Sequence, residues 1–451
     1  MAPIPSADDT LRRLEPLGMR QDLAPFRRLL AALGEPQAEL QVVLVAGTNG
    51  KGSTAALLAG IACAAGYRTG LYSSPHLEEP RERIRVDGLA LPTLELDRLL
   101  HGVVAAAREE EPPTPFEALT AAAFVAFAEA GVELAVMEVG LGGRLDATNA
   151  AEPVLSLVSE VALDHQEQLG GSLEGIAFEK GGIFRAGRPA LAWVTAPEAA
   201  AGLRRAAAAA GAEVELLPEE WRAETRARGE GGQRVRLAGP TGGRELLLPL
   251  GGAHQRGNLV LAVAAAEDLS VSGWPRLVDA VGRGVAGTRW PGRLESVTLP
   301  GGRRVLLDGA HNPHAVAALA AELEARGEPY GLVFGALADK DVAGMAEAIA
   351  PRARRVWLAP PASPRAMTLE ALAAQPPLAA AVPCAGAEEA LAAALDSPLD
   401  SPEGLPLVVT GSLYLVGEAR QILRERFGVP PPAALVPAWE DPMGARARVD
   451  A

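Results

Sequence analysis

Residues 45–54 read Val-Ala-Gly-Thr-Asn-Gly-Lys-Gly-Ser-Thr and follow the mostly apolar run 40–44. The pattern predicts a buried strand, a glycine-rich turn with one lysine, and a helix over 53–65. Glycines let backbone N–H groups approach an anion, a helix N-terminus adds positive potential, and Lys51 neutralises phosphate charge. The spacing departs from the usual phosphate loop, since fewer residues separate the glycines and Gly52 follows the lysine. The segment still predicts a nucleotide-binding site.

Composition and charge narrow the class of protein. The chain has 451 residues, of which 49% are hydrophobic, enough for two or three globular domains with a large core. Its net charge of −14 argues against a nucleic-acid or membrane partner, although local cations can still bind an anionic ligand. Two cysteines are too few for a disulfide framework or a zinc site. Without a signal-like N-terminal segment or a long apolar run, we expect a cytoplasmic protein.

The sequence around the phosphate loop predicts alternating strands and helices. Strands are expected at 68–73, 132–139 and 154–163. The helices expected in this part of the chain are 22–34, 94–110 and 117–131. Such alternation predicts an α/β fold with a mostly parallel sheet and helices on both faces. Residues 233–237 and 244–248, separated by glycines and a proline, are instead typical of an antiparallel pair.

The turn-rich stretch 287–293 is the predicted joint between two domains. A second α/β series is expected after it, with strands at 304–307, 330–334, 355–358 and 407–410 and helices at 314–326, 342–350 and 417–427. We therefore expect a P-loop nucleotide-binding domain over 1–292 and a smaller, Rossmann-like C-terminal α/β domain over 293–429. The proline-rich tail 430–451 is predicted to be disordered.

Polar residues fall at the ends of several predicted strands. Ser74, Glu138, His165 and Asp308 lie at or just after such ends, where α/β proteins bind their ligands. Three more histidines lie in predicted loops: His76, His254 and His311. Burial of Glu138 in its apolar strand is costly unless the carboxylate is paired or binds a cation. Beside phosphates, Mg²⁺ is the natural cation; a structural carboxylate that holds a loop amide is the alternative.

Two further positions stay open when they are judged from their own residues. Asp146 and Asn149, in Gly-Gly-Arg-Leu-Asp-Ala-Thr-Asn, either contact an organic substrate or cap the turn. Lys180 follows a short predicted helix, and on this ground alone it is expected to be a surface lysine.

Eight motifs occur in order: Ala-Gly-Thr-Asn-Gly-Lys-Gly-Ser at 46–53, Tyr-Ser-Ser-Pro-His at 72–76, Glu-Val-Gly-Leu-Gly-Gly-Arg-Leu-Asp-Ala-Thr-Asn at 138–149, Asp-His at 164–165, Glu-Lys-Gly-Gly-Ile at 179–183, His-Gln-Arg-Gly-Asn at 254–258, Pro-Gly-Arg at 291–293 and Asp-Gly-Ala-His-Asn-Pro at 308–313. Together they resemble the folylpolyglutamate synthase/dihydrofolate synthase family, part of the Mur ligase group. The resemblance runs from about Leu17 to Phe427. One departure is Gly181-Gly182, where the family more often has Ala-Gly.

The resemblance implies an ATP-dependent amide ligase. ATP phosphorylates a carboxylate of the pterin substrate, and the amine of L-glutamate attacks the acyl phosphate. The expected acceptors are dihydropteroate and reduced folates, as in the bifunctional bacterial enzymes, and the expected state is a monomer. Chain extension of folates alone is one alternative. Another Mur-type ligase, acting on a cell-wall precursor, and a nucleotide-binding regulator without catalysis are the others.

The resemblance also implies roles for single residues. ATP contacts are expected at Asn49, Gly50, Lys51, Gly52, Ser53, Asn258, Arg293 and Asp308. Two Mg²⁺ sites are expected, the first at Ser74 and Glu138 and the second at Glu138 and His165, with a carbamylated Lys180 nearby. Substrate contacts are expected at Phe116, Glu117, Ala118, Leu119, Leu145, Asp146, Ala147 and Ser412. The expected catalytic residues are Lys51, Glu138, His165, Lys180 and His311.

Overall fold

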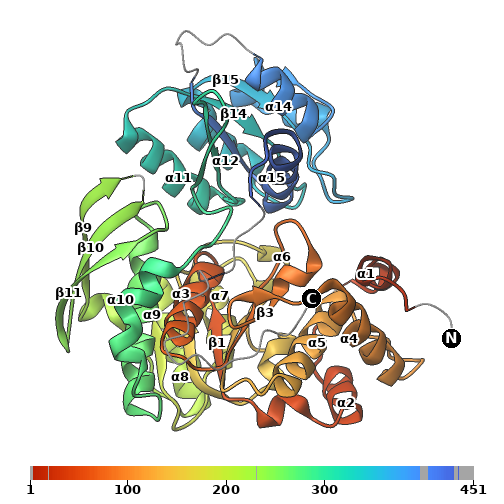
Figure 1. Ribbon diagram of the computed structural model, residues 1–451, viewed down its shortest axis with the longest axis vertical. Coiled ribbons are helices and arrows are strands. Elements are labelled where there is room, and N and C mark those ends of the chain that lie inside the picture. The colour runs from red at the N-terminus through yellow and green to blue at the C-terminus, as the bar shows by residue number, and fades with distance from the viewer. Residues whose placement is uncertain (1–3, 19, 230, 397–404, 431–434, 436–451) are drawn as a thin grey trace.

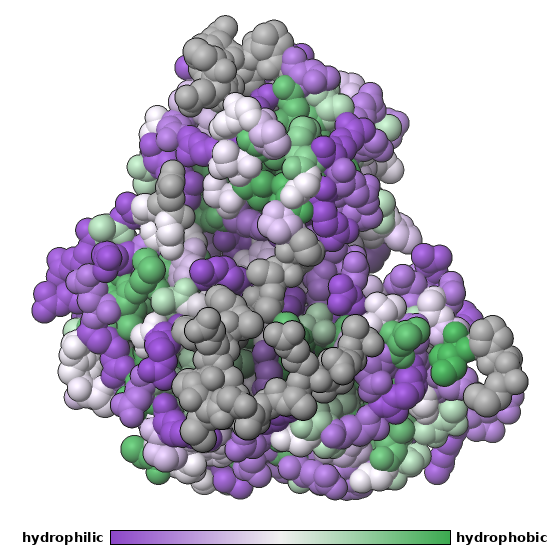
Figure 2. Space-filling view, in the orientation of Figure 1, coloured by the Kyte–Doolittle hydropathy of each residue, from purple (hydrophilic) through white to green (hydrophobic). Residues whose placement is uncertain are grey.

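The computed structural model describes residues 4–18, 20–229, 231–396, 405–430 and 435. Figure 1 shows two α/β domains, the N-terminal one below and the C-terminal one above, joined by the segment after α10. Hydrophilic residues cover much of the face in Figure 2, and hydrophobic residues form separate smaller patches on it. Among the residues described, no helix is long and apolar enough to cross a membrane.

The N-terminal domain is built on an eight-stranded sheet in the order β4-β3-β2-β5-β1-β6-β7-β8. Its strands are β1 (Val42–Ala46), β2 (Thr69–Tyr72), β3 (Ile84–Val86), β4 (Leu89–Ala90), β5 (Leu134–Glu138), β6 (Pro153–Val158), β7 (Ala190–Ala192) and β8 (Glu215–Leu216). In this spatial order, the six strands β2-β5-β1-β6-β7-β8 pair in parallel, and β3 and β4 add an antiparallel edge. The predicted mostly parallel sheet is confirmed.

Helices cover both faces of this sheet. One face carries α1 (Ala7–Leu14), α2 (Ala24–Ala32), α4 (Thr93–Ala106), α5 (Pro115–Glu129), α7 (Leu173–Lys180) and α8 (Pro197–Ala210). The other carries α3 (Lys51–Ala64), α9 (Gln255–Val271) and α10 (Leu277–Gly287). A short α6 (Gln166–Leu169) follows His165. Gly284 lets α10 lie against α3, because a Cβ there would stand 2.4 Å from the Cα of Ile61.

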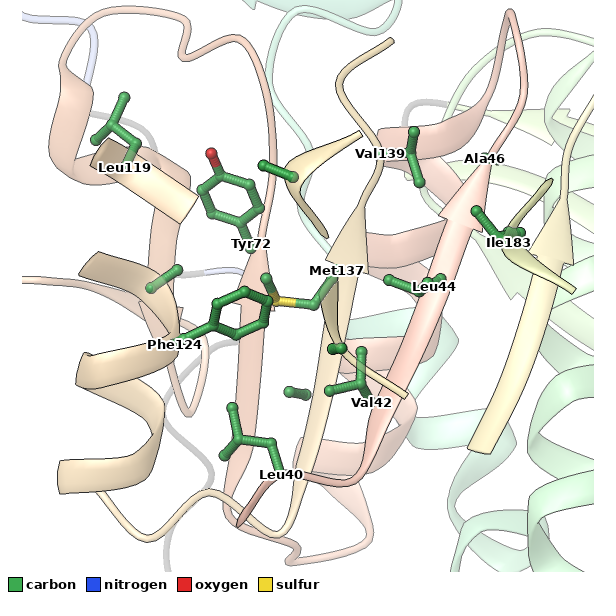
Figure 3. Packing of buried hydrophobic residues seen from close by; sticks show 14 of the residues in the cluster. Leu40, Val42, Leu44, Ala46, Tyr72, Leu119, Phe124, Met137, Val139 and Ile183 are labelled. Carbon is green, nitrogen blue, oxygen red and sulfur yellow. The ribbon is translucent and has the colours of Figure 1, made fainter. Parts of the chain in front are cut away.

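The alternation of side chains along β1 explains why both faces need cover. Val42 and Leu44 point to the face where Phe124 of α5 packs (Figure 3), and Val43 and Val45 point to the helices of the other face. All five residues of β1 are buried. Complete burial of a side chain such as Phe124 contributes about 1.5–3 kcal/mol to folding.

A small antiparallel sheet extends from this domain. Its strands are β9 (Arg222–Gly229), β10 (Gly232–Gly239) and β11 (Gly242–Leu248), in the order β11-β10-β9. The predicted pair corresponds to β10 and β11. Strand β9 was not predicted, because it is largely exposed and rich in charged residues and so lacks the apolar alternation that identifies a strand.

The C-terminal domain has a six-stranded sheet in the order β12-β13-β17-β14-β15-β16, parallel except for β12. The strands are β12 (Glu295–Thr298), β13 (Arg304–Leu307), β14 (Tyr330–Phe334), β15 (Ala353–Leu358), β16 (Val382–Pro383) and β17 (Leu407–Thr410). The helices are α11 (Pro313–Arg326), α12 (Val342–Ile349), α13 (Leu369–Ala373), α14 (Ala387–Leu395) and α15 (Leu413–Phe427).

Some predicted boundaries were wrong. The strand expected to reach residue 163 ends at Val158, because the chain then bends beneath the phosphate loop, where the carbonyl of Glu160 accepts the N–H groups of Thr48 and Asn49. Helix α4 ends at Ala106 rather than at residue 110. Helix α15 begins about a turn before the predicted start at residue 417, because the Ser412 side chain caps it.

The chain passes between the domains in the segment between Gly287, the last residue of α10, and Glu295, the first of β12. The predicted division at 292/293 falls inside this segment. Of the tail 430–451, the structure describes Pro430 and Leu435, and the rest of the predicted disordered tail lies outside the described residues. Leu435 is buried, its N–H donates to the Gly88 carbonyl, and its own carbonyl accepts the N–H of Arg289.

Candidate active site

A cavity of about 830 Å³ lies where the two domains meet, at the carboxyl ends of the central strands of both sheets. Its N-terminal side is lined by the phosphate loop, Ser74, Glu138 and the turn after β5. Its C-terminal side is lined by the loops after β13, β14 and β17. A cavity of this size, with apolar and polar walls, fits small organic ligands.

The phosphate loop has the backbone that its glycines predict. Gly47 and Gly50 have φ angles of 144° and 92°, in the region that favours glycine. A Cβ on Gly47 would stand 2.0 Å from Ser159 Oγ, and one on Gly50 would stand 2.1 Å from Asn258 Oδ1. Helix α3 begins directly afterwards, at Lys51. The first turn of a helix thus opens on the cavity, as an anion site requires.

The carboxylate of Glu138 borders the cavity beside the phosphate loop. It ends β5, is 6% exposed, and its Oε2 accepts the N–H of Ser74 at 3.1 Å. Burial raises the pKa of Glu138, and the nearby Lys51 ammonium opposes that shift. The alternative of a carboxylate holding a loop amide is therefore correct for one oxygen. Its Oε1 accepts no hydrogen bond from the residues described, so it is available to a cation.

Gly52, the residue that breaks the usual phosphate-loop pattern, lies against this carboxylate. A Cβ on Gly52 would stand 3.2 Å from both Glu138 Oε2 and Trp290 Nε1. The glycine therefore allows the first turn of α3 to approach the end of β5, and the departure from the common motif has a packing reason.

Lys180 is not a surface residue, so that reading of the sequence was wrong. It is the last residue of α7, is 4% exposed, and its Nζ donates to the Gly47 carbonyl at 2.8 Å. Burial, with a contribution from the Lys51 charge, lowers the pKa of Lys180 to about 7. It supports the phosphate loop from beneath and does not line the cavity.

A polar network connects the two domains across the cavity. Asn312, the N-cap of α11, donates to Asn49 Oδ1 at 3.0 Å and to Asp164 Oδ2 at 3.1 Å. Lys340 donates to Asp164 Oδ1 at 2.7 Å and lies 3.3 Å from His165 Nε2. Burial alone would raise the pKa of Asp164, but His165 and Lys340 outweigh it and keep that pKa below its usual range.

In the Asp-Gly-Ala-His-Asn-Pro segment at 308–313, the side chains of Asp308 and His311 are both held by backbone groups. Asp308 accepts the N–H groups of Leu294 at 2.8 Å and Ala310 at 2.9 Å, which ties the joint to the end of β13. His311 Nδ1 lies 2.8 Å from the Gly309 carbonyl, which can only accept, so we assign the proton to Nδ1. Burial lowers the pKa of His311 to about 4, which leaves Nε2 as an acceptor on the cavity side.

The other end of the cavity is more apolar. Phe116, Leu145 and Ala147 line it, and Arg20 pairs with Glu117 at 3.3 Å beside them. Asp146 also lines it and accepts the N–H groups of Leu141 and Thr148. Asp146 is thus a turn cap that also reaches the cavity.

Two residues next in sequence to the cavity wall face the protein core instead. Ala118 and Leu119 are buried in the hydrophobic cluster and do not line the cavity, contrary to the expectation. Successive residues of α5 point about 100° apart, so the helix that presents Phe116 and Glu117 to the cavity turns the next residues away. Asn149 also lies off the cavity, where it donates to the carbonyls of Arg144 and Gly182.

The structure brings most of the expected site residues to the one cavity. Those that line it are Asn49, Gly50, Lys51, Gly52, Ser53, Ser74, Phe116, Glu117, Glu138, Leu145, Asp146, Ala147, His165, Asn258, Arg293, Asp308, His311 and Ser412. Those that do not are Ala118, Leu119 and Lys180. Among the described residues, no three His, Cys, Asp or Glu side chains are grouped closely enough to hold a metal ion. The ligand contacts themselves stay predictions.

Sequence reasoning missed several residues of the cavity wall. Among them are Arg20, Gln21, Arg83, Trp193 and Lys340. Lys340 had a usable signal, because Ala-Asp-Lys-Asp at 338–341 follows the predicted strand 330–334 and so falls at a carboxyl end of the sheet. Arg20 and Gln21 had none, since they lie in a short connection before α2 with no periodicity around them.

Comparison with known proteins agrees with this geometry. The family model of the Mur ligase middle domain matches residues 45–266, and that of the Mur ligase glutamate ligase domain matches 292–413. The chain is 35% identical over 418 residues to folylpolyglutamate synthase of Lacticaseibacillus casei, covering 88% of this chain and 92% of that one. It is 36% identical over 361 residues to dihydrofolate synthase/folylpolyglutamate synthase of Bacillus subtilis, covering 77% and 83%. The structure of E. coli FolC with DHPP and ADP superposes with a TM-score of 0.83 at 32% identity, covering 94% of this chain and 98% of that one.

Proposed function

This chain belongs to the folylpolyglutamate synthase/dihydrofolate synthase group of the Mur ligases, and from this membership we propose that it is an ATP-dependent amide ligase. Its acceptors are dihydropteroate and the glutamate tail of reduced folates, and its donor is L-glutamate. The observation that carries the proposal is the cavity between the domains, in which a phosphate loop from one domain meets an apolar pocket and the polar loops of the other.

In the first step, the acceptor carboxylate attacks the γ-phosphorus of ATP. The new O–P bond gives an acyl phosphate, and ADP leaves with the electron pair of the broken P–O bond. Lys51 and the N–H groups at the start of α3 offset the negative charge that spreads over the phosphoryl oxygens. Asn258, Arg293 and Asp308, which line the same cavity, are assigned to the rest of the nucleotide. Positioning, rather than covalent help from the protein, supplies most of the rate enhancement.

In the second step, the amine of L-glutamate attacks the carbonyl carbon of the acyl phosphate. The new C–N bond forms as inorganic phosphate leaves with the C–O electron pair, and the amine loses a proton. His311 Nε2 is an acceptor on the cavity side, so it is suited to orient that amine. Ser412, the N-cap of α15, is assigned to the glutamate as well.

The donor set at Ser74 and Glu138 fits Mg²⁺. It offers hydroxyl and carboxylate oxygens beside the phosphate loop, and one oxygen of Glu138 accepts no hydrogen bond from the described residues. When bound, Mg²⁺ would neutralise phosphate charge. The second expected site is less complete, because His165 faces the Lys340 ammonium and Lys180 donates to a carbonyl.

Carbamylation of Lys180 is part of the proposal. A pKa of about 7 leaves a large neutral fraction of the amine near neutral pH. The neutral amine can add to CO₂ with loss of one proton, which gives a carbamate anion under the phosphate loop, where the protonated amine would be a cation. Mass spectrometry of the intact protein under bicarbonate, with Lys180→Met as the control, tests this: we expect a gain of the mass of CO₂ in the wild type alone.

The test of the function is phosphate release with Mg-ATP, L-glutamate and either dihydropteroate or tetrahydrofolate, with the product masses measured. Glutamate addition to both acceptors establishes the bifunctional enzyme. Addition to tetrahydrofolate alone restricts the chain to tail extension. ATP binding without turnover on either acceptor overturns the proposal and favours a regulator or another Mur-type ligase. A cytoplasmic location and a monomeric state also stay predictions.

A further inference from the structure

The loop that carries Ser74 is in contact with the C-terminal domain at a place outside the cavity. Ser74 follows β2, and its N–H donates to Glu138. A few residues later, Leu77 packs against a hydrophobic cluster of the C-terminal domain. Gly417 of α15 makes room for this contact, because a Cβ there would stand 1.8 Å from the Leu77 carbonyl oxygen. The loop and α15 are therefore pressed backbone to backbone.

A buried ionic network surrounds that contact. Arg420 of α15 donates to Glu78 Oε1 at 2.7 Å and to Glu295 at 3.0 Å, and Arg424 pairs with the other oxygen of Glu78. The side chains of Glu78 and Arg420 are 2% and 4% exposed. Glu295 in turn accepts the N–H of Gly292 at 3.0 Å, in the joint between the domains. We call these four charged residues the Glu78 clasp.

Hydrogen bonds within the loop connect Glu78 to the residues that precede it. Glu82 accepts the N–H groups of Leu77, Glu78 and Glu79 at 3.0, 3.1 and 2.9 Å. The N–H of Ser73 donates to the Arg83 carbonyl at 2.9 Å. These bonds hold residues 73–83 together as one turn, so we expect a displacement of Glu78 to displace the rest of the turn.

We propose that the Glu78 clasp positions the Ser74 loop, so that the edge of the cavity formed by Ser74 and Glu138 takes its working geometry only when α15 is docked. Glu78 and Arg420 are positioning residues: they lie outside the cavity wall and act through Ser74. Helix α15 suits this role because its first residues line the cavity and its middle touches the loop and the joint. The inference rests on the proposed ligase function for its kinetic consequence alone.

Glu78→Gln is the decisive variant, since it removes one charge across the domains and leaves Arg420 paired with Glu295. Under saturating substrates we expect kcat to fall at least tenfold, with KM values for ATP and the acceptor within twofold of the wild type. We also expect backbone amides of 73–79 to exchange hydrogen at least tenfold faster in the presence of ADP, with those of β5 unchanged. A fall in thermal stability alone, with kcat and exchange unaltered, overturns the proposal.

Glu388→Gln is the matched control. Glu388 of α14 pairs with Arg426 of α15, the helix that also carries Arg420, but the Glu388 and Arg426 side chains are 71% and 45% exposed and lie on the surface. We expect no change in kcat or in exchange at 73–79 for this variant, and a change equal to that of Glu78→Gln would overturn the clasp as the cause.

Two additional variants keep the test decisive. If Glu78→Gln does not fold, Arg424→Gln removes the more exposed partner of Glu78, an arginine side chain that is 27% exposed, and leaves the bond from Arg420 to Glu78. We then expect a smaller acceleration of exchange at 73–79, and no acceleration would overturn the proposal. Arg420→Lys should restore part of the kcat lost in Arg420→Gln. If the wild type releases no phosphate with either acceptor, the proposed function fails, while exchange at 73–79 still tests the clasp.

Discussion

The two walls of the cavity are built in different ways. The N-terminal wall, formed by the phosphate loop, Ser74 and Glu138, depends on backbone geometry: positive φ angles at Gly47 and Gly50 and a helix that starts at Lys51. The C-terminal wall, formed by the loops that carry Asp308, His311, Lys340 and Ser412, depends on side chains that reach in from three strand ends.

The two walls should therefore contribute differently to nucleotide binding and to turnover. A backbone anion site works within one domain, so the N-terminal wall should supply most of the nucleotide affinity, and Asp308 of the C-terminal wall should add a smaller part. The side chains of the C-terminal wall reach the N-terminal wall only across the domain interface, where Asn312 and Lys340 contact Asp164. The C-terminal wall should therefore control turnover more than nucleotide affinity, and the following variants test that division.

The largest effect is expected for Lys51→Ala in the N-terminal wall. Removal of this cation should lower kcat by about a thousandfold, because it offsets charge that grows in the transition state. It should also weaken ADP binding, since Lys51 lies at the phosphate loop. Phosphate release and calorimetric titration with ADP measure the two effects. Nucleotide affinity equal to that of the wild type would contradict the assignment of this wall.

A smaller effect is expected for Lys340→Met in the C-terminal wall. The variant leaves Asp164 without its closest cation, and we expect kcat to fall by about ten- to a hundredfold, while ADP affinity changes less than threefold. The same two assays compare it directly with Lys51→Ala. A large loss of ADP affinity with an unchanged kcat would contradict the assignment of turnover, rather than nucleotide affinity, to the C-terminal wall.

Two nearby residues of α5 should respond differently to truncation, because Phe116 lines the cavity and Leu119 lies in the hydrophobic core. Phe116→Ala should raise the KM for the acceptor about tenfold, because the ring lines the apolar end of the cavity. Leu119→Ala should destabilise the protein by about 2–5 kcal/mol and leave the KM unchanged, because Leu119 is buried in the core. Urea unfolding and acceptor titrations distinguish the two variants. An increased KM in Leu119→Ala would show that Leu119 contributes to acceptor binding.

The smallest expected effect is on the pH dependence of the free energy of unfolding, and a buried histidine near each wall should contribute to it in the same direction. Burial lowers the pKa of His76, beside the N-terminal wall, to about 3 and that of His311 to about 4. The unfolded chain binds these protons near pH 6.5, so stability is complete above that value and falls as the pH drops toward 4. His76→Gln and His311→Gln should each reduce the slope of unfolding free energy against pH by at most about 1.4 kcal/mol per unit. Equal slopes in wild type and variants would contradict the burial of these rings as neutral groups.

The sequence predicted the fold well where its physical signals are local. Strands β14 and β17 were placed at their observed bounds because apolar runs between turn residues mark buried parallel strands. The polar, exposed β9 gave no such signal and was missed. Likewise, the phosphate loop was identified from its glycines and lysine, whereas Ala118 and Leu119 were assigned to the site because a linear motif does not tell which face of a helix a residue occupies.

Consecutive residues alone specify the strand–loop–helix of the proposed phosphate site, because glycine torsions, a helix start and one lysine are local properties of the chain. The sequence also determines the order of the motifs by which the family is identified. The folded chain, in contrast, sets the burial of Lys180 under Gly47 and the contacts of Asp164 with Lys340 and of Glu78 with Arg420. Each of these contacts joins residues far apart in the chain, and burial and charge pairing are set by neighbours in space.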